Sequence, residues 1–185
     1  VYSHRVTWPE HPLVRDINTR FDAPHSRWND VARDQLEEAG LVVLADSERA
    51  GVHLAVSPDL FRIIYFQGHP EYDAFSLLKE YKREVIRFLN GELAEPPPFP
   101  EYYFPHNAKV LALEFLRSVR GSRNPATHVS DFPEEELLAL VDNTWRDTGK
   151  AIVNNWLGLV YRLTNLDRKK PFMDGVDPSD PLNLL

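Results

Sequence analysis

Residues 62–73 read RIIYFQGHPEYD, and this stretch sets the fold expected around it. The β-branched and aromatic run 62–66 predicts a strand, and Gly68 ends it. A His-Pro-Glu turn follows, and a helix is expected from Asp73 onward. A strand that passes through a short polar turn into a helix is typical of α/β folds.

The turn itself places two groups of chemical interest two residues apart, His69 and Glu71. Pro70 holds His69 extended, and residues two apart in an extended segment point the same way. A carboxylate on one imidazole nitrogen fixes the tautomer and leaves the other nitrogen free as a base. The spacing therefore indicates the base and orienter of a nucleophilic triad. The plainer alternative is a turn histidine beside a helix-capping acid.

Two further apolar runs, 41–45 and 52–56, predict strands before this motif. Their connections to each other and to 62–66 are short enough for hairpins, so we expect some antiparallel pairing. Residues 1–26 have little periodicity and predict loop with a short strand or two. The tail from Thr164 is rich in Asp and Pro and is expected to be irregular.

The first expected helix is 29–39, with Asn29 as its cap and Gly40 as a left-handed end. The clearest is 73–90, which has one continuous apolar stripe and Asp73 as a plausible cap. Further helices are expected at 109–119, 131–141 and 144–163, with a polar loop at 121–130 and a capping box of Asp131 and Glu134.

Composition excludes several classes of function. The chain has 185 residues and a net charge of −7, which argues against a dedicated nucleic-acid binder. No apolar run approaches the roughly 18 residues that suggest a membrane span. The absence of cysteine removes disulfides and a cysteine nucleophile within this chain, and it fits a reducing compartment. His25 and His106 stand in no metal-ligand motif, so no metal is expected.

Several segments together resemble one enzyme family. GHPE after an apolar strand is similar to the end of the triad in class I glutamine amidotransferases. The longer match is to the homoserine O-acyltransferases of methionine biosynthesis, usually called homoserine O-succinyltransferases. It is carried by VYSH at 1–4, APHSR at 23–27, GHPEYDA at 68–74, YFPHN at 103–107 and NWL at 155–157.

The resemblance implies a Cys-His-Glu triad that moves an acyl group from acyl-CoA to the hydroxyl of L-homoserine. His69 would be the base and Glu71 its orienter. Ser26 matches a substrate-binding serine, and Arg83 matches an arginine that holds the homoserine carboxylate. The competing interpretations are a turn or cap serine at position 26 and a solvated helix face at position 83.

The family's nucleophile and oxyanion hole lie upstream of the segment that matches Val1. We therefore expect a C-terminal part of a class I glutamine amidotransferase-like, flavodoxin-like three-layer α/β sandwich, inactive by itself. Residues 1–90 would complete the catalytic core, and 91–185 would form a helical region with an insertion at about 108–142. The resemblance further implies no bound cofactor, succinyl-CoA or acetyl-CoA as co-substrate, a homodimer and a cytoplasmic location. A glutamine amidotransferase domain and a non-catalytic relative are the alternative functions.

Overall fold

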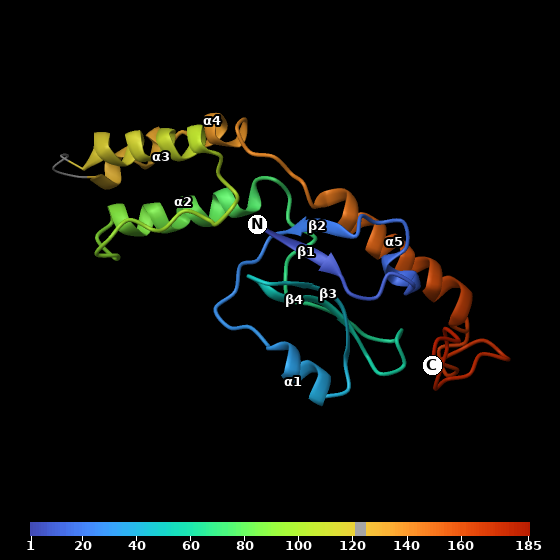
Figure 1. Ribbon diagram of the computed structural model, residues 1–185. Helices are drawn as coiled ribbons and strands as arrows, with labels where there is room; N and C mark the ends of the chain where they lie inside the picture. Colours follow the sequence, from blue (N-terminus) through green and yellow to red (C-terminus); the bar gives the residue numbers. More distant parts are fainter. Residues whose placement is uncertain (121–124) are drawn as a thin grey trace. The chain divides into compact units, whose positions relative to one another are not determined.

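The structure, a computed structural model, describes residues 1–120 and 125–185 (Figure 1). The chain divides into two compact units. The sheet unit consists of Tyr2–Glu71 and Thr144–Leu185, and the helical unit consists of Val1 and Tyr72–Asn143. Strands and helices together confirm the α/β class.

The sheet unit is built on a five-stranded sheet with the strand order β2-β1-β3-β4-β5. Every described pairing is antiparallel, as the short connections predict. The flavodoxin-like arrangement of the whole family fold stays a prediction. The strands are β1 (Tyr2–Val6), β2 (Arg20–Ala23), β3 (Val42–Ser47), β4 (Gly51–Val56) and β5 (Ile64–Phe66).

A helix covers each face of this sheet (Figure 1). On one face, Leu36 of α1 (Arg33–Glu38) packs in a small apolar cluster with residues of β3 and β4. On the other face, Ile152 of α5 (Arg146–Leu163) belongs to the larger core. Irregular pairing between β3 and β4 near Ala45 lets successive residues of β3 enter that larger core. The sheet-side members of that core include Leu44, Ala45, Leu54 and Val56.

The start of α1 differs from the predicted one. The helix begins at Arg33 with Ala32 as its N-cap, so Asn29 does not cap it. The Gln67 side chain accepts from the Val31 backbone N–H at 2.7 Å and donates to the Val31 carbonyl at 2.9 Å. These bonds engage the backbone groups that a longer helix would use. The predicted left-handed end at Gly40 is confirmed, with φ of 79°.

The longest helix, α5, is tied to the start of the chain through Asn155. Its side-chain amide donates to the carbonyls of Leu13 and Arg15 at 3.1 and 2.7 Å. Leu13 lies in the short 3₁₀ helix η1 (Pro12–Val14). The tail after α5 has no helix or strand, as predicted. In the part of the chain that the structure describes, α5 included, no helix has both the length and the apolar content to cross a membrane.

The helical unit contains α2 (Ser76–Leu89) and α3 (His106–Val119). The apolar stripe predicted for the first of these is confirmed as its buried face. Asp73 contacts the start of α2, where its Oδ1 accepts from the Phe75 backbone N–H at 3.0 Å, but Phe75 is the N-cap residue. The stripe consists of Leu77, Leu78, Tyr81, Val85 and Leu89.

The region after α3 corrects three predictions. The 3₁₀ helix η2 covers Pro125–Asp131, which includes residues 125–130 of the predicted loop. Helix α4 covers only Glu134–Leu138 rather than 131–141. The predicted capping box does not form, because the Asp131 carboxylate pairs with His128 at 2.9 Å and Pro133 is the N-cap of α4. The remainder of the predicted loop, 121–124, lies outside the described residues.

Candidate functional site

The His-Pro-Glu turn joins His69 and Glu71 directly. His69 Nδ1 lies 2.8 Å from Glu71 Oε1, as their spacing predicts. The turn directly follows β5, so the sheet fixes the backbone position from which the His69 side chain extends. The His69 side chain is half-buried, and that of Glu71 is largely exposed. This geometry orients the ring with Nδ1 toward the carboxylate and Nε2 away from it.

A second segment, 24–26, brackets His69 from the other side. The His69 backbone N–H donates to the Pro24 carbonyl at 2.8 Å. The ring nitrogen Nε2 lies 3.1 Å from the Ser26 carbonyl. This segment directly follows β2, the edge strand that ends at Ala23, so β2 places it beside the turn. The backbone and the ring of His69 are thus both in contact with the same short segment.

Three histidines meet directly behind the turn. His4 and His53 are 1% exposed, and His25 is half-buried. Their ligand atoms lie within 4.8 Å of one another. Gly68 allows this packing, since a Cβ built there would lie 2.6 Å from His53 Nδ1 and 2.8 Å from His25 Nε2. Any side chain at position 68 would therefore displace the histidines or the turn.

Hydrogen bonds fix the tautomers of two of these rings. The Arg27 guanidinium, which can only donate, contacts His25 Nδ1. His25 then carries its proton on Nε2 and donates to His4 Nε2 at 2.9 Å. Burial, followed by the neighbouring His4 and Arg27, lowers the pKa of His25 to about 3. Burial lowers the pKa of His4 to about 4 and holds that of His53 well below its usual range. The cluster is neutral near pH 7.

Three converging histidines are also the residue type of a zinc site. Here, however, the His25 and His4 Nε2 atoms lie 2.9 Å apart, at hydrogen-bonding distance from each other. Histidine ligands usually donate their second N–H to a carboxylate or carbonyl, whereas the second nitrogen of His25 accepts from a cation. This chemistry favours a hydrogen-bonded histidine cluster over a metal centre.

The first turn of helix α5 packs against the His-Pro-Glu turn. Pro70 shares a small pocket with Trp145, Gly149 and Ile152, and the Trp145 side chain is 2% exposed. The loop before α5 is attached to the sheet, because Thr144 Oγ1 donates to Asp22 Oδ2 at 2.7 Å. The His-Pro-Glu turn therefore packs against the start of α5, which is buried and hydrogen-bonded to the sheet.

The other two predicted site residues lie in different settings. Ser26 belongs to the segment that brackets His69, and it is half-buried. Arg83 lies on α2 in the helical unit, where its side chain is 68% exposed and its Nε donates to Glu84 at 3.1 Å. Exposure agrees with the solvated face that periodicity predicts, and it leaves the guanidinium accessible to a ligand.

The sequence considered His25 only as an isolated residue; its cluster with His4 and His53, and its contact with Arg27, were not predicted. The three histidines come from β1, β4 and the segment after β2, so no local spacing in the sequence predicts that they meet. One signal was present: glycine is common where the backbone approaches another group closely, and Gly68 stands directly before His69. Nothing in the sequence states which side chains make that approach.

Comparisons with known proteins agree with these motifs. The family model described as homoserine O-succinyltransferase matches residues 1–166. A protein of that name from Methylococcus capsulatus is 58% identical over 184 residues, covering 100% of this chain and 52% of the relative. The same name is carried by a relative from Thiothrix nivea, which is 55% identical over 100% of this chain and 51% of its own length. The chain thus spans about half the length of the curated relatives it matches. With a family match over most of its length, the chain belongs to the homoserine O-succinyltransferase family.

Proposed function

We propose that the whole protein transfers a succinyl group from succinyl-CoA to the hydroxyl of L-homoserine, the first committed step of methionine biosynthesis. The observation that carries this proposal is the 2.8 Å contact between His69 Nδ1 and Glu71 Oε1 in a chain of this family. The name of the relatives, homoserine O-succinyltransferase, specifies the succinyl group and homoserine. Acetyl-CoA is the alternative donor.

In the proposed reaction, Glu71 accepts from the His69 Nδ1–H and thereby leaves Nε2 as the basic atom. Nε2 removes the proton of a cysteine thiol, and the sulfur attacks the thioester carbonyl of the acyl-CoA. The bond between the acyl carbon and the CoA sulfur breaks, and His69 returns the proton to the departing thiolate. Free CoA leaves behind an acyl-cysteine.

His69 then acts a second time in the same role. Nε2 takes the hydroxyl proton of homoserine, and the oxygen attacks the acyl-cysteine. The carbon–sulfur bond breaks, and the cysteine sulfur recovers the proton, giving O-acylhomoserine. While the ring holds two protons, its Nε2–H can donate to the Ser26 carbonyl, which lies 3.1 Å away.

The nucleophile is proposed to come from the part of the protein outside this chain, because the 185 residues include no cysteine. The length of the relatives supports this, since the chain covers 52% of the Methylococcus protein. We propose that the Ser26 hydroxyl contacts homoserine and that the exposed Arg83 guanidinium binds its carboxylate. No bound cofactor is required, and a cytoplasmic homodimer is the proposed working form.

The test is CoA release by the full-length protein with succinyl-CoA and either homoserine, serine or no acceptor. Homoserine-dependent release supports the proposal, and release that depends instead on serine would change the acceptor. Acetyl-CoA in a parallel assay identifies the donor. Glutaminase activity without acyl transfer would support the amidotransferase alternative. The 185-residue chain assayed alone should give no release, and turnover by it would contradict an external nucleophile.

A further inference from the structure

The segment that brackets His69 is itself held at its centre by the side chain of His25. Pro24 and Ser26 supply the two carbonyls that meet the His69 backbone and ring, at 2.8 and 3.1 Å. His25 stands between them in sequence: the Pro24 carbonyl belongs to the peptide unit directly before His25, and the Ser26 carbonyl to the second peptide unit after it. A contact that holds the His25 ring therefore also restrains the backbone that carries these two carbonyls.

Arg27 holds that ring with one of its guanidinium nitrogens, and a second nitrogen anchors the Arg27 side chain to the backbone. One guanidinium nitrogen donates to His25 Nδ1, and another donates to the Ala50 carbonyl at the turn before β4. Asp30 adds a longer ion pair at 3.6 Å. The Arg27 side chain is only 20% exposed. The Arg27 guanidinium is thus hydrogen-bonded to groups of the protein, and it links the segment after β2 to the turn between β3 and β4.

The other edge of the His25 ring is equally constrained. Its Nε2–H donates to His4 Nε2 at 2.9 Å, and the two rings are nearly parallel, with 10° between their planes. The same Nε2 would lie 2.8 Å from a Cβ at Gly68, the residue before His69. A change of tautomer at His25 would remove the donor to His4. It would also set a ring N–H against the Arg27 guanidinium.

We propose that Arg27 is a positioning residue for His69, acting through the fixed neutral tautomer of His25 on the carbonyls of Pro24 and Ser26. This role rests on the proposed function, in which His69 is the base of acyl transfer. A direct role for Arg27 in binding a carboxylate or phosphate of a substrate is the main alternative. The two roles differ in whether the His25 tautomer and the His69 ring respond to loss of the guanidinium.

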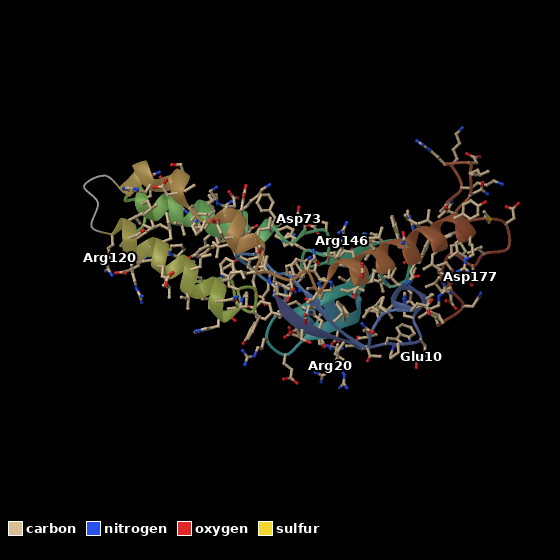
Figure 2. All side chains as sticks on the ribbon, turned by 90° about the horizontal axis from the view of Figure 1, so that it is seen from above. Glu10, Arg20, Asp73, Arg120, Arg146 and Asp177 are labelled. Carbon is tan, nitrogen blue, oxygen red and sulfur yellow. The ribbon has the colours of Figure 1, made fainter. Side chains whose placement is uncertain are left out.

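The experiment uses the full-length protein with ¹⁵N-labelled histidine rings, as wild type, Arg27→Lys and Arg27→Ala. Lysine retains a positive charge but cannot span both acceptors as the fork does. The control is Arg20→Ala, which removes an exposed arginine from β2 of the same unit (Figure 2). Ring ¹⁵N shifts report tautomer and protonation directly, and they need no catalytic activity.

In the wild type and in Arg20→Ala, His25 should show the neutral Nε2–H tautomer throughout pH 5–8. In both Arg27 variants, His25 should lose that single tautomer and the His69 ring signals should move. kcat should fall about ten- to hundredfold with a change in KM for homoserine below about threefold, since a misplaced base slows chemistry more than binding. Added guanidinium should restore the spectrum and rate of Arg27→Ala.

Unchanged His25 and His69 signals in folded Arg27→Lys would overturn the positioning role, as would an Nδ1–H tautomer at His25 in the wild type. A raised KM with unchanged kcat and unchanged ring signals would assign Arg27 to substrate binding instead. If the spectra change as expected but the wild type releases no CoA with homoserine, positioning is supported and the proposed reaction falls.

Discussion

Gly149 of α5 lies directly against Pro70, the residue between His69 and Glu71. A Cβ built on Gly149 would lie 2.8 Å from the Pro70 carbonyl oxygen and 3.1 Å from its Cβ. Glycine within a helix costs about 0.5–1 kcal/mol relative to alanine. Its place here is explained by packing, because only a residue without a side chain lets α5 support the turn at this distance.

Gly149→Ala should therefore move the turn. The contact is to backbone, which cannot swing aside, so we expect a loss of about 1–3 kcal/mol in the free energy of unfolding. We also expect a roughly tenfold or larger fall in kcat from displacement of the His69–Glu71 pair. Urea unfolding and homoserine-dependent CoA release by the full-length protein measure the two effects.

Gly158→Ala is the matched control in the same helix. Nothing lies within 4 Å of a Cβ at Gly158. The substitution should raise the free energy of unfolding by about 0.5–1 kcal/mol and leave kcat unchanged. Equal effects of the two substitutions would show that α5 does not position the turn.

Glu71→Gln tests the orienter. Glutamine keeps the size of the side chain but replaces the carboxylate, so the imidazole loses its fixed tautomer and the partner of its positive charge. We expect kcat to fall about 10²- to 10⁴-fold, with little change in stability because the Glu71 side chain is 66% exposed. A rate within threefold of the wild type, measured on protein with unchanged thermal unfolding, would refute the orienting role.

His11 should make the fold sensitive to acid. It is 1% exposed, and its Nδ1 accepts from the Leu13 backbone N–H at 3.2 Å while Nε2–H donates to the Leu60 carbonyl at 3.1 Å. Burial lowers the pKa of His11 from 6.5 to about 4. Between these values the unfolded chain binds a proton that the native chain does not, so stability falls as the pH falls. The loss attributable to His11 is about 3 kcal/mol.

His11→Asn should flatten this dependence. Asparagine can still accept from the Leu13 backbone N–H, but it does not titrate, so the variant should lose less stability between pH 7 and 4.5. At pH 7 it should be about 1 kcal/mol less stable than the wild type, because the bond to the Leu60 carbonyl is lost. Urea unfolding at the two pH values measures both effects. An unchanged pH dependence would mean that His11 does not contribute to the acid sensitivity.

Arg83→Ala tests the proposed carboxylate contact. Loss of a charge-assisted hydrogen bond should raise KM for homoserine about 10- to 100-fold with a smaller effect on kcat. Arg87→Ala, one helical turn further along α2, removes the same charge from a side chain paired with Glu84 and Glu92. The Arg87 variant should keep the wild-type KM. Equal KM values for both variants would assign Arg83 to the solvated face alone.

The sequence predicted best those features that depend on local pattern. The apolar stripe of α2, the strands β3 to β5 and the His69–Glu71 contact all follow from periodicity or from a spacing of two residues. The start of α1 was wrong because Gln67, distant in sequence, binds the backbone of Val31. The capping box at Asp131 failed because its carboxylate pairs with His128, while the Glu134 backbone N–H donates to the Phe132 carbonyl at 2.8 Å.

Long-range pairing was beyond such patterns. The order β2-β1-β3-β4-β5 places the N-terminal strand at the interior of the sheet, although residues 1–26 show little periodicity. That placement brings His4 beside His25 and His53, and it creates the cluster behind Gly68. Local sequence cannot reveal the cluster, since it exists only once three separate segments are packed together.

The central claim is that His69 drives acyl transfer through a covalent acyl-enzyme, and intact-protein mass spectrometry tests it most directly. Full-length wild type mixed with succinyl-CoA alone should gain the mass of one succinyl group and lose it when homoserine is added. His69→Ala should form the adduct at least about 10²-fold more slowly, because no base generates the thiolate. Acylation and discharge of folded His69→Ala at the wild-type rates would contradict the account.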